Sequence, residues 1–177
     1  MTEEMVFAGF GGQGVLSLGQ IVAYSGMLEG KEVCWMPSYG PEMRGGTANC
    51  IVSVSDQPIS SPILATFDTA IILNRPSYDK FESRVKEKGV LIYDKTNINV
   101  EPSRNDIEII GIDASKTAKE LGNMQVMGMV LLGAYLKKKN IVKKETVKEA
   151  LKKVLPERHH KLIPLNIEAL EKGMSLI

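Results

Sequence analysis

The chain has 177 residues, of which 44% are hydrophobic and 24% charged, with 22 Lys and Arg against 21 Asp and Glu. This composition is typical of a globular protein and excludes intrinsic disorder, collagen and coiled coil. The longest mostly apolar run, residues 127–136, is too short to span a bilayer, and the N-terminus lacks the pattern of a signal peptide. We therefore expect one domain over residues 1–177, located in the cytoplasm and without membrane contact.

The first two thirds of the chain alternate short apolar runs with helical patterns, which predicts an α/β domain with a mostly parallel sheet. Strands are predicted at residues 5–8, 32–36, 47–55, 69–73, 90–93 and 107–112, and helices at 14–29 and 76–88. The region 37–63 suits an antiparallel or edge extension of that sheet. The last third is predicted to be helical, with helices ending at residue 121 and spanning 124–138, 143–155 and 157–172.

A glycine-rich turn follows the first predicted strand and precedes the first predicted helix. Gly9, Gly11 and Gly14 fit the pattern G-x-G-x-x-G, which lets a backbone approach a phosphate at a helix N-terminus. A dinucleotide site would require an acid after the second strand, whereas residues 34–37 read Cys-Trp-Met-Pro. NAD is therefore disfavoured. Two interpretations stay open: another phosphate-bearing ligand, or a tight turn that binds nothing.

The segment 37–46 holds two prolines and three glycines in ten residues and is predicted to be an ordered loop. It carries the polar side chains of Ser38, Tyr39, Glu42 and Arg44. Arg44 suits bidentate binding of a carboxylate or phosphate, and it equally suits a structural ion pair with Glu42. The pattern does not choose between the two.

Basic residues are concentrated near the C-terminus, where residues 137–161 hold ten Lys and Arg and three Glu. Val147, Ala150 and Leu151 recur at helical spacing, so a solvated helix face is favoured and an acidic partner comes next. Aromatic residues are scarce in this segment, which does not support nucleic-acid binding.

The sequence offers no self-sufficient catalytic set and no metal site. His159 and His160 are adjacent in a predicted helix and point in different directions, so a surface position is expected. Cys34 and Cys50 are too few for an iron–sulfur cluster or a structural zinc site, and two free thiols are expected.

Two segments together resemble a known family. Residues 9–15 (Gly-Phe-Gly-Gly-Gln-Gly-Val) and 38–47 (Ser-Tyr-Gly-Pro-Glu-Met-Arg-Gly-Gly-Thr) are similar to the gamma subunit of 2-oxoacid:ferredoxin oxidoreductases. The likeness continues at residues 56–62, 121–123, 132–134 and 166–173. The loop looks most like the 2-oxoglutarate branch, with branched-chain 2-oxoacid enzymes close behind.

This resemblance implies a three-layer α/β fold and a role in oxidative decarboxylation. A 2-oxoacid and coenzyme A (CoA) give acyl-CoA and CO₂, and ferredoxin accepts the electrons. Thiamine diphosphate and iron–sulfur clusters are then expected on the companion alpha, beta and ferredoxin-like subunits, with none bound by this chain alone.

The resemblance also assigns site residues. The turn residues Gly9, Gly11, Gly12, Gln13 and Gly14 are expected to cradle the CoA diphosphate in a shared site. The loop residues Ser38, Tyr39, Glu42 and Arg44 are expected at a subunit interface or ligand loop.

One departure from the family is Met127-Gly128, where Ala-Asn is common, so a role of that Asn side chain is missing here. The alternatives are an indolepyruvate or branched-chain 2-oxoacid oxidoreductase subunit and a stand-alone CoA- or nucleotide-binding module.

Overall fold

A computed structural model describes residues 1–38 and 46–177 of the chain. Its sheet has six strands in the order β2-β3-β1-β4-β5-β6. The strands are β1 (Thr2–Phe10), β2 (Glu32–Ser38), β3 (Thr47–Ser55), β4 (Phe67–Ile72), β5 (Val85–Asp94) and β6 (Glu108–Ile112). Strands β1, β4, β5 and β6 pair in parallel, whereas β3 pairs antiparallel with both β1 and β2. The mostly parallel sheet with an antiparallel extension is confirmed.

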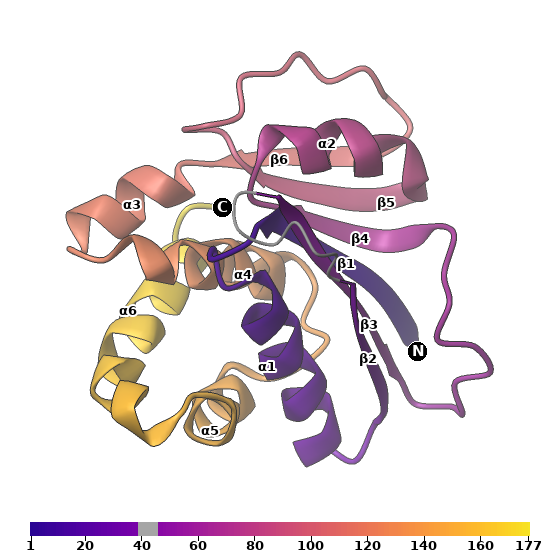
Figure 1. Ribbon diagram of the computed structural model, residues 1–177. Helices are drawn as coiled ribbons and strands as arrows, with labels where there is room; N and C mark the ends of the chain where they lie inside the picture. Colours follow the sequence, from indigo (N-terminus) through magenta and orange to yellow (C-terminus); the bar gives the residue numbers. More distant parts are fainter. Residues whose placement is uncertain (39–45) are drawn as a thin grey trace.

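Helices cover both faces of this sheet. They are α1 (Val15–Leu28), α2 (Arg75–Phe81), α3 (Ala114–Glu120), α4 (Met127–Lys138), α5 (Lys144–Val154) and α6 (Ile163–Met174), with 3₁₀ turns η1 (Glu82–Arg84), η2 (Met124–Val126) and η3 (Glu157–Leu162). Helix α2 lies on one face, α1 and α4 lie on the other, and α5 and α6 pack outside them (Figure 1). This arrangement confirms the three-layer α/β fold and the helical C-terminal third.

Strand β1 is buried on both faces, which explains why its sequence is a continuous apolar run rather than an alternating one. Met5 and Phe7 belong to the larger core beneath α1 and α4. Val6 and Ala8 belong to the smaller core on the opposite face. The glycine turn at the end of β1 is therefore attached to a strand that packing fixes on both faces.

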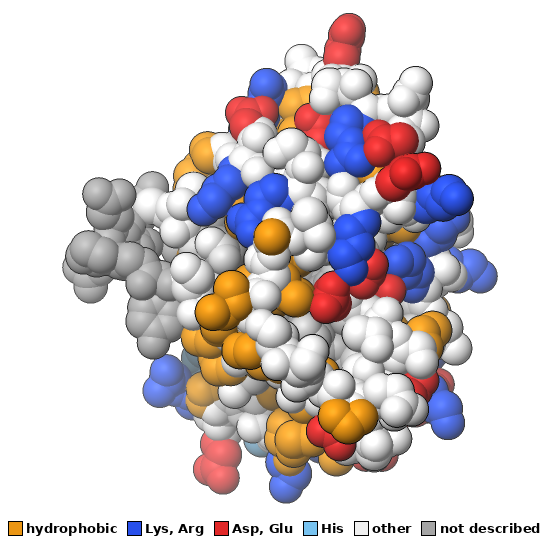
Figure 2. Space-filling view, turned by 90° about the vertical axis from the view of Figure 1, so that its right-hand side faces the viewer, with side chains coloured by type: hydrophobic (Ala, Val, Ile, Leu, Met, Phe, Trp, Pro, Cys, Tyr) orange, Lys and Arg blue, Asp and Glu red, His pale blue; other side chains and the backbone are white. Residues whose placement is uncertain are grey.

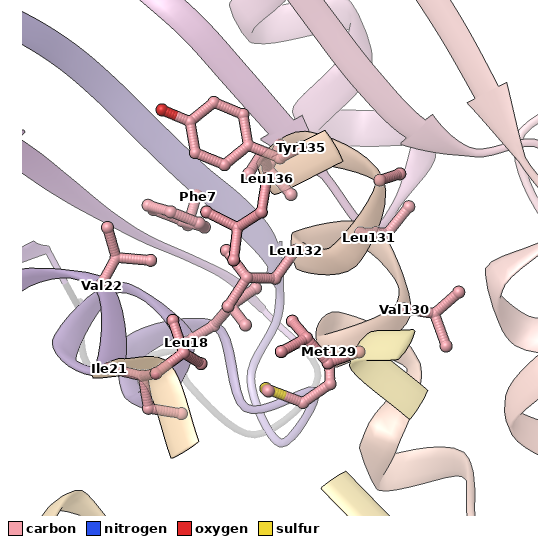
Figure 3. Close-up of a cluster of buried hydrophobic side chains, with 14 of the residues drawn as sticks. Phe7, Leu18, Ile21, Val22, Met129, Val130, Leu131, Leu132, Tyr135 and Leu136 are labelled. Carbon is pink, nitrogen blue, oxygen red and sulfur yellow. The ribbon is translucent and has the colours of Figure 1, made fainter. Parts of the chain in front are cut away.

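Helix α4 is buried along its whole apolar length, as its sequence predicts. All ten residues from Met127 to Leu136 are buried. Figure 3 shows Leu132 of α4 among side chains that include Leu18 of α1 and Phe7 of β1. Full burial of a side chain of this size contributes about 1.5–3 kcal/mol, so α4 supplies much of the core energy.

The predicted helix over 76–88 is wrong in its second half. Helix α2 ends at Phe81, and a 3₁₀ turn leads into β5, which begins at Val85 opposite Phe67. The guanidinium of Arg84 lies over the rings of Phe67 and Phe81 and its Nε donates to the carbonyl of Ala65. These tertiary contacts override the helical propensity of the charged residues 82–88.

The predicted helix over 157–172 is divided in two. Residues 157–162 form the 3₁₀ turn η3, and α6 begins at Ile163 with Pro164 in its first turn. Proline lacks a backbone N–H and clashes with the preceding turn inside a helix, so it is favoured in the first turn. Pro164 therefore lies at the start of α6 rather than inside one helix over 157–172.

Helices α4 and α6 cross at two glycines. A Cβ added at Gly133 would collide with the carbonyl of Leu170, and one at Gly173 would collide with the carbonyl of Val130. Each contact is to backbone, so no rotamer change could relieve it. This crossing fixes the position of α6 and of η3 before it.

We predict that Gly133→Ala destabilises the protein by about 3 kcal/mol, because an added methyl group in a close-packed contact cannot be accommodated. Gly128→Ala is the matched control on the same helix, since its Cβ would meet the flexible side chain of Leu18 at 3.2 Å. Urea unfolding followed by circular dichroism measures both variants. Equal midpoints for the two would contradict the close crossing.

Candidate functional site

The glycine turn joins β1 to α1 and is held by hydrogen bonds to the protein's own backbone. The Oε1 of Gln13 accepts from the amide of Phe10 at 2.6 Å, and its Nε2 donates to the carbonyl of Leu73 at 3.4 Å. The amide of Gly11 donates to the carbonyl of Gly46 at 2.9 Å. The side chain of Gln13 thus shapes the turn by bonding to the protein's own backbone.

Two glycines in the turn adopt backbone conformations that other residues rarely take. Gly12 has φ 94° and Gly14 has φ 75°, and a Cβ on either would face open space. Gly14 is the N-cap of the 14-residue helix α1 and brings no side-chain acceptor to its amides. These amides and the helix dipole favour an anion at this place.

A cavity of about 170 Å³ opens beside the turn. Of the five predicted turn residues, Gly12, Gln13 and Gly14 line it, whereas Gly9 and Gly11 do not. Gly9 is buried, and a Cβ there would lie 2.6 Å from the Oε1 of Gln13, so its role is to give that side chain room.

The opposite wall of the cavity comes from the C-terminal third of the chain. The remaining lining residues are Ser17, Leu18, Ile21, Asn123, Gln125, Val126, Gly128, Met129, Leu155, His159, Leu162 and Asn166. The cavity thus combines an apolar interior with polar groups from η2, η3 and α6. Such a lining suits an organic ligand that carries both apolar and polar parts.

Two amide side chains of this wall are fixed by local hydrogen bonds. The Oδ1 of Asn123 accepts from the amide of Gln125 at 2.9 Å and caps η2. The Nδ2 of Asn166 donates to the carbonyl of Leu162 at 2.8 Å. The NH₂ group of Asn123 and the carbonyl oxygen of Asn166 are therefore the groups that can hydrogen-bond to a ligand.

The two histidines occupy different environments, which the sequence does not predict. His160 lies with its Nε2 2.8 Å from the carbonyl of Leu155, whereas His159 lines the cavity. Both are half-buried rather than exposed. Half-burial agrees with the surface position expected for this pair, but the sequence does not predict that His159 lines the cavity, because only the fold brings η3 opposite the glycine turn.

Ion pairs with Glu171 partly neutralise the lysines in the first part of α5, but not the basic residues at its end and in η3. Hydrogen bonds from Lys148 and Lys144 lower the pKa of Glu171. No described carboxylate forms an ion pair with Lys152, Lys153, Arg158 or Lys161. Helix α5 buries Val147, Ala150 and Leu151, which confirms the predicted amphipathic pattern. The last turn of α5 and η3 thus form a cationic region next to the cavity.

The predicted loop is described only at its two ends. Ser38 is the last residue of β2, is exposed and pairs with Asn49, and Gly46 bonds to the glycine turn. Tyr39, Glu42 and Arg44 lie outside the described residues. The flanking residues nevertheless place the start of β3 beside the turn.

Gly128, at the position where the resemblance leads us to expect Asn, lines the cavity with backbone alone. The neighbouring Met127 is buried, and its Sδ lies 2.9 Å from the Oγ of Ser115. The wall near Gly128 is therefore closed by Leu18, the nearest side chain to this glycine.

The cysteines are free, with Cys50 buried and Cys34 half-buried. Burial raises the pKa of the Cys50 thiol to about 12, which makes it a packing residue rather than a nucleophile. Among the described residues, no three His, Cys, Asp or Glu side chains form a group able to hold a metal ion. None of the helices in residues 1–38 and 46–177 has the length and apolar character to cross a membrane.

Comparison with known proteins identifies the family. Residues 4–176 match the family model described as pyruvate ferredoxin/flavodoxin oxidoreductase. The chain belongs to this family. Its sequence is 36% identical over 167 residues to the ketoisovalerate oxidoreductase subunit VorA of Methanothermobacter thermautotrophicus, a match that covers 94% of this chain and 34% of that protein. The chain thus spans about a third of that relative's length.

Two solved structures show the same fold. The gamma subunit of a keto/oxoacid ferredoxin oxidoreductase from Geobacter sulfurreducens is 30% identical, with a TM-score of 0.84 over 99% of this chain and 98% of that one. The 2-oxoglutarate:ferredoxin oxidoreductase from Magnetococcus marinus, with 2-oxoglutarate, coenzyme A and succinyl-CoA bound, is 28% identical. It has a TM-score of 0.88 over 99% of this chain and 31% of that one. The chain therefore has the fold of the gamma subunit from Geobacter sulfurreducens and of about a third of the Magnetococcus marinus chain.

Proposed function

We propose that this chain is the gamma subunit of a CoA-dependent 2-oxoacid:ferredoxin oxidoreductase, acting foremost on 2-oxoglutarate, and that it binds part of the CoA. The complex cleaves the bond between the carboxylate and the oxo carbon, releases CO₂ and transfers the acyl group to the CoA sulfur. The electron pair left by this oxidation passes to ferredoxin.

The observation that carries the proposal is the cavity between the glycine turn and the cationic region. CoA is an anion with phosphates at one end and apolar and amide groups along its length. The backbone amides beside Gly12 and Gly14 suit its diphosphate, and the apolar interior and the amides of Asn123 and Asn166 suit the rest. In this role the chain binds and orients CoA and keeps water from it.

The redox chemistry is assigned to companion subunits. A cluster normally needs four thiolates, and this sequence holds only Cys34 and Cys50, which do not fit one. Thiamine diphosphate supplies the carbanion chemistry of decarboxylation when it is bound to those partners.

The surface agrees with a chain that works within a complex. Figure 2 shows Lys, Arg, Asp and Glu interspersed over the upper and right-hand part of one face, whereas apolar side chains gather below. Among the exposed apolar residues are Phe10, next to the glycine turn, and Ile63 in the β3–β4 connection. We propose that alpha, beta and ferredoxin-like subunits cover such surfaces, with Ser38, Tyr39, Glu42 and Arg44 at that interface or at the ligand.

We predict that Gly12→Val raises the KM for CoA several-fold and leaves the KM for the 2-oxoacid nearly unchanged, because the side chain fills the space of the diphosphate. Gly30→Val is the matched control, since Gly30 also has a positive φ, of 72°, and faces open space. Both variants carry a similar backbone strain of roughly 1–2 kcal/mol. Circular dichroism first checks that both variants are folded. Steady-state kinetics on the assembled complex then measures the KM for CoA and the KM for the 2-oxoacid. Equal CoA kinetics in both variants would place the CoA site elsewhere.

We further predict that the isolated chain folds and is inactive in 2-oxoacid-dependent viologen reduction, because it lacks cluster and thiamine ligands. Activity should appear when the companion subunits are added. Arms with 2-oxoglutarate, ketoisovalerate and indolepyruvate separate the proposed substrate, 2-oxoglutarate, from its two alternatives, and the likeness to VorA makes ketoisovalerate the first of these two. Turnover by this polypeptide alone would refute the role, and CoA binding without any productive complex would indicate a stand-alone module.

A further inference from the structure

The cavity has two walls that suit anions, and only one of them is explained by a diphosphate. The first wall is the glycine turn with the N-terminus of α1. The second is η3, where His159 lines the cavity and the exposed Arg158 contacts His159. A ligand with a single anionic group would leave the second wall without a function.

The side chains of Arg158 and His159 form one donor unit. The Nε of Arg158 donates to the Nε2 of His159 at 3.3 Å, so the imidazole proton lies on Nδ1. The guanidinium remains charged at any physiological pH and has further N–H groups to offer. Guanidinium and imidazole donors together are suited to a phosphoryl group, which has several strong acceptor oxygens.

The surrounding charge supports an anion at this wall. Lys152, Lys153 and Lys161 lie in the same stretch and form no ion pair with a described carboxylate, and Glu157 is the one carboxylate in residues 152–161. This stretch therefore carries a net positive charge, and it supplies Leu155 and His159 to the cavity lining while its lysines are exposed. Exposed lysine side chains raise the local potential even when they do not touch the ligand.

We infer that Arg158 and His159 bind the 3′-phosphate of CoA and make the complex select CoA over dephospho-CoA. The inference rests on the proposed function, since it assumes that the diphosphate occupies the glycine turn. In CoA the diphosphate and the 3′-phosphate are attached to the same ribose. The glycine turn and His159 line the same cavity of about 170 Å³, so one ribose that carries both phosphates would bring each of them to one of these two places.

The test compares CoA with dephospho-CoA as acyl acceptors for the assembled complex. We expect wild-type kcat/KM to be at least roughly tenfold higher for CoA, since hydrogen bonds to charged groups of this kind contribute about that factor or more. His159→Ala and Arg158→Ala should lower kcat/KM for CoA and leave that for dephospho-CoA nearly unchanged. The preference should then fall to within about twofold.

His160→Gln is the matched control, because His160 contacts the carbonyl of Leu155 and does not line the cavity. It should keep the wild-type preference. A loss of folding would affect both acceptors equally, so the ratio of the two separates a binding role from a structural one. Circular dichroism melting of each variant checks this directly.

The outcomes distinguish this inference from the proposed function. If wild type uses CoA and dephospho-CoA equally while Gly12→Val still impairs both, the 3′-phosphate assignment fails and the CoA site stands. Equal losses for both acceptors in His159→Ala would also overturn it, since the histidine would then contact another part of the ligand. If neither acceptor responds to Gly12→Val, the site itself is elsewhere.

Discussion

The close crossing of α4 and α6 determines where the second wall of the cavity stands. At Gly133 and Gly173 each helix meets the backbone of the other, which leaves no space for a side chain. Helix α4 is itself fixed because its apolar residues are buried against α1 and the sheet. The position of η3, which directly precedes α6, therefore follows from this packing of α6 against α4.

Helix α1 is placed by the same kind of contact on its other side. A Cβ at Gly19 would collide with the Sγ of Cys50, and one at Gly26 would lie 2.8 Å from a methyl group of Val33. Small residues thus let α1 approach β2 and β3 closely, and its N-terminus lies at the end of β1. The anion-binding turn and the helix dipole are consequently held in a fixed orientation, which lowers the entropic cost of binding a flexible ligand.

Much of the fold and half of the site could be predicted from the sequence. The pattern of Gly9, Gly11 and Gly14 between a strand and a helix identifies the turn. Gly14 is required there by its positive φ, and Gly9 by the close approach of the Gln13 side chain. The helix over 82–88 was mispredicted because Arg84 is held by the distant Phe67.

The second wall of the cavity could not be predicted for a related reason. Asn123, His159 and Asn166 lie far from the glycine turn in sequence, and no periodicity or spacing shows that they meet it. Tertiary packing alone brings them there. Their short-range roles, such as the cap that Asn123 forms on η2, are visible from the sequence, whereas their access to the cavity is not.

The central claim is that the glycine turn and η3 face one bound CoA. Hydrogen–deuterium exchange of the assembled complex, with and without CoA, tests it most directly, since amides that contact or lie beneath a ligand exchange more slowly. The account predicts CoA-dependent protection in peptides covering residues 9–18 and 155–166, and no change in α2. Protection confined to the companion subunits, with both of these peptides unchanged, would contradict it.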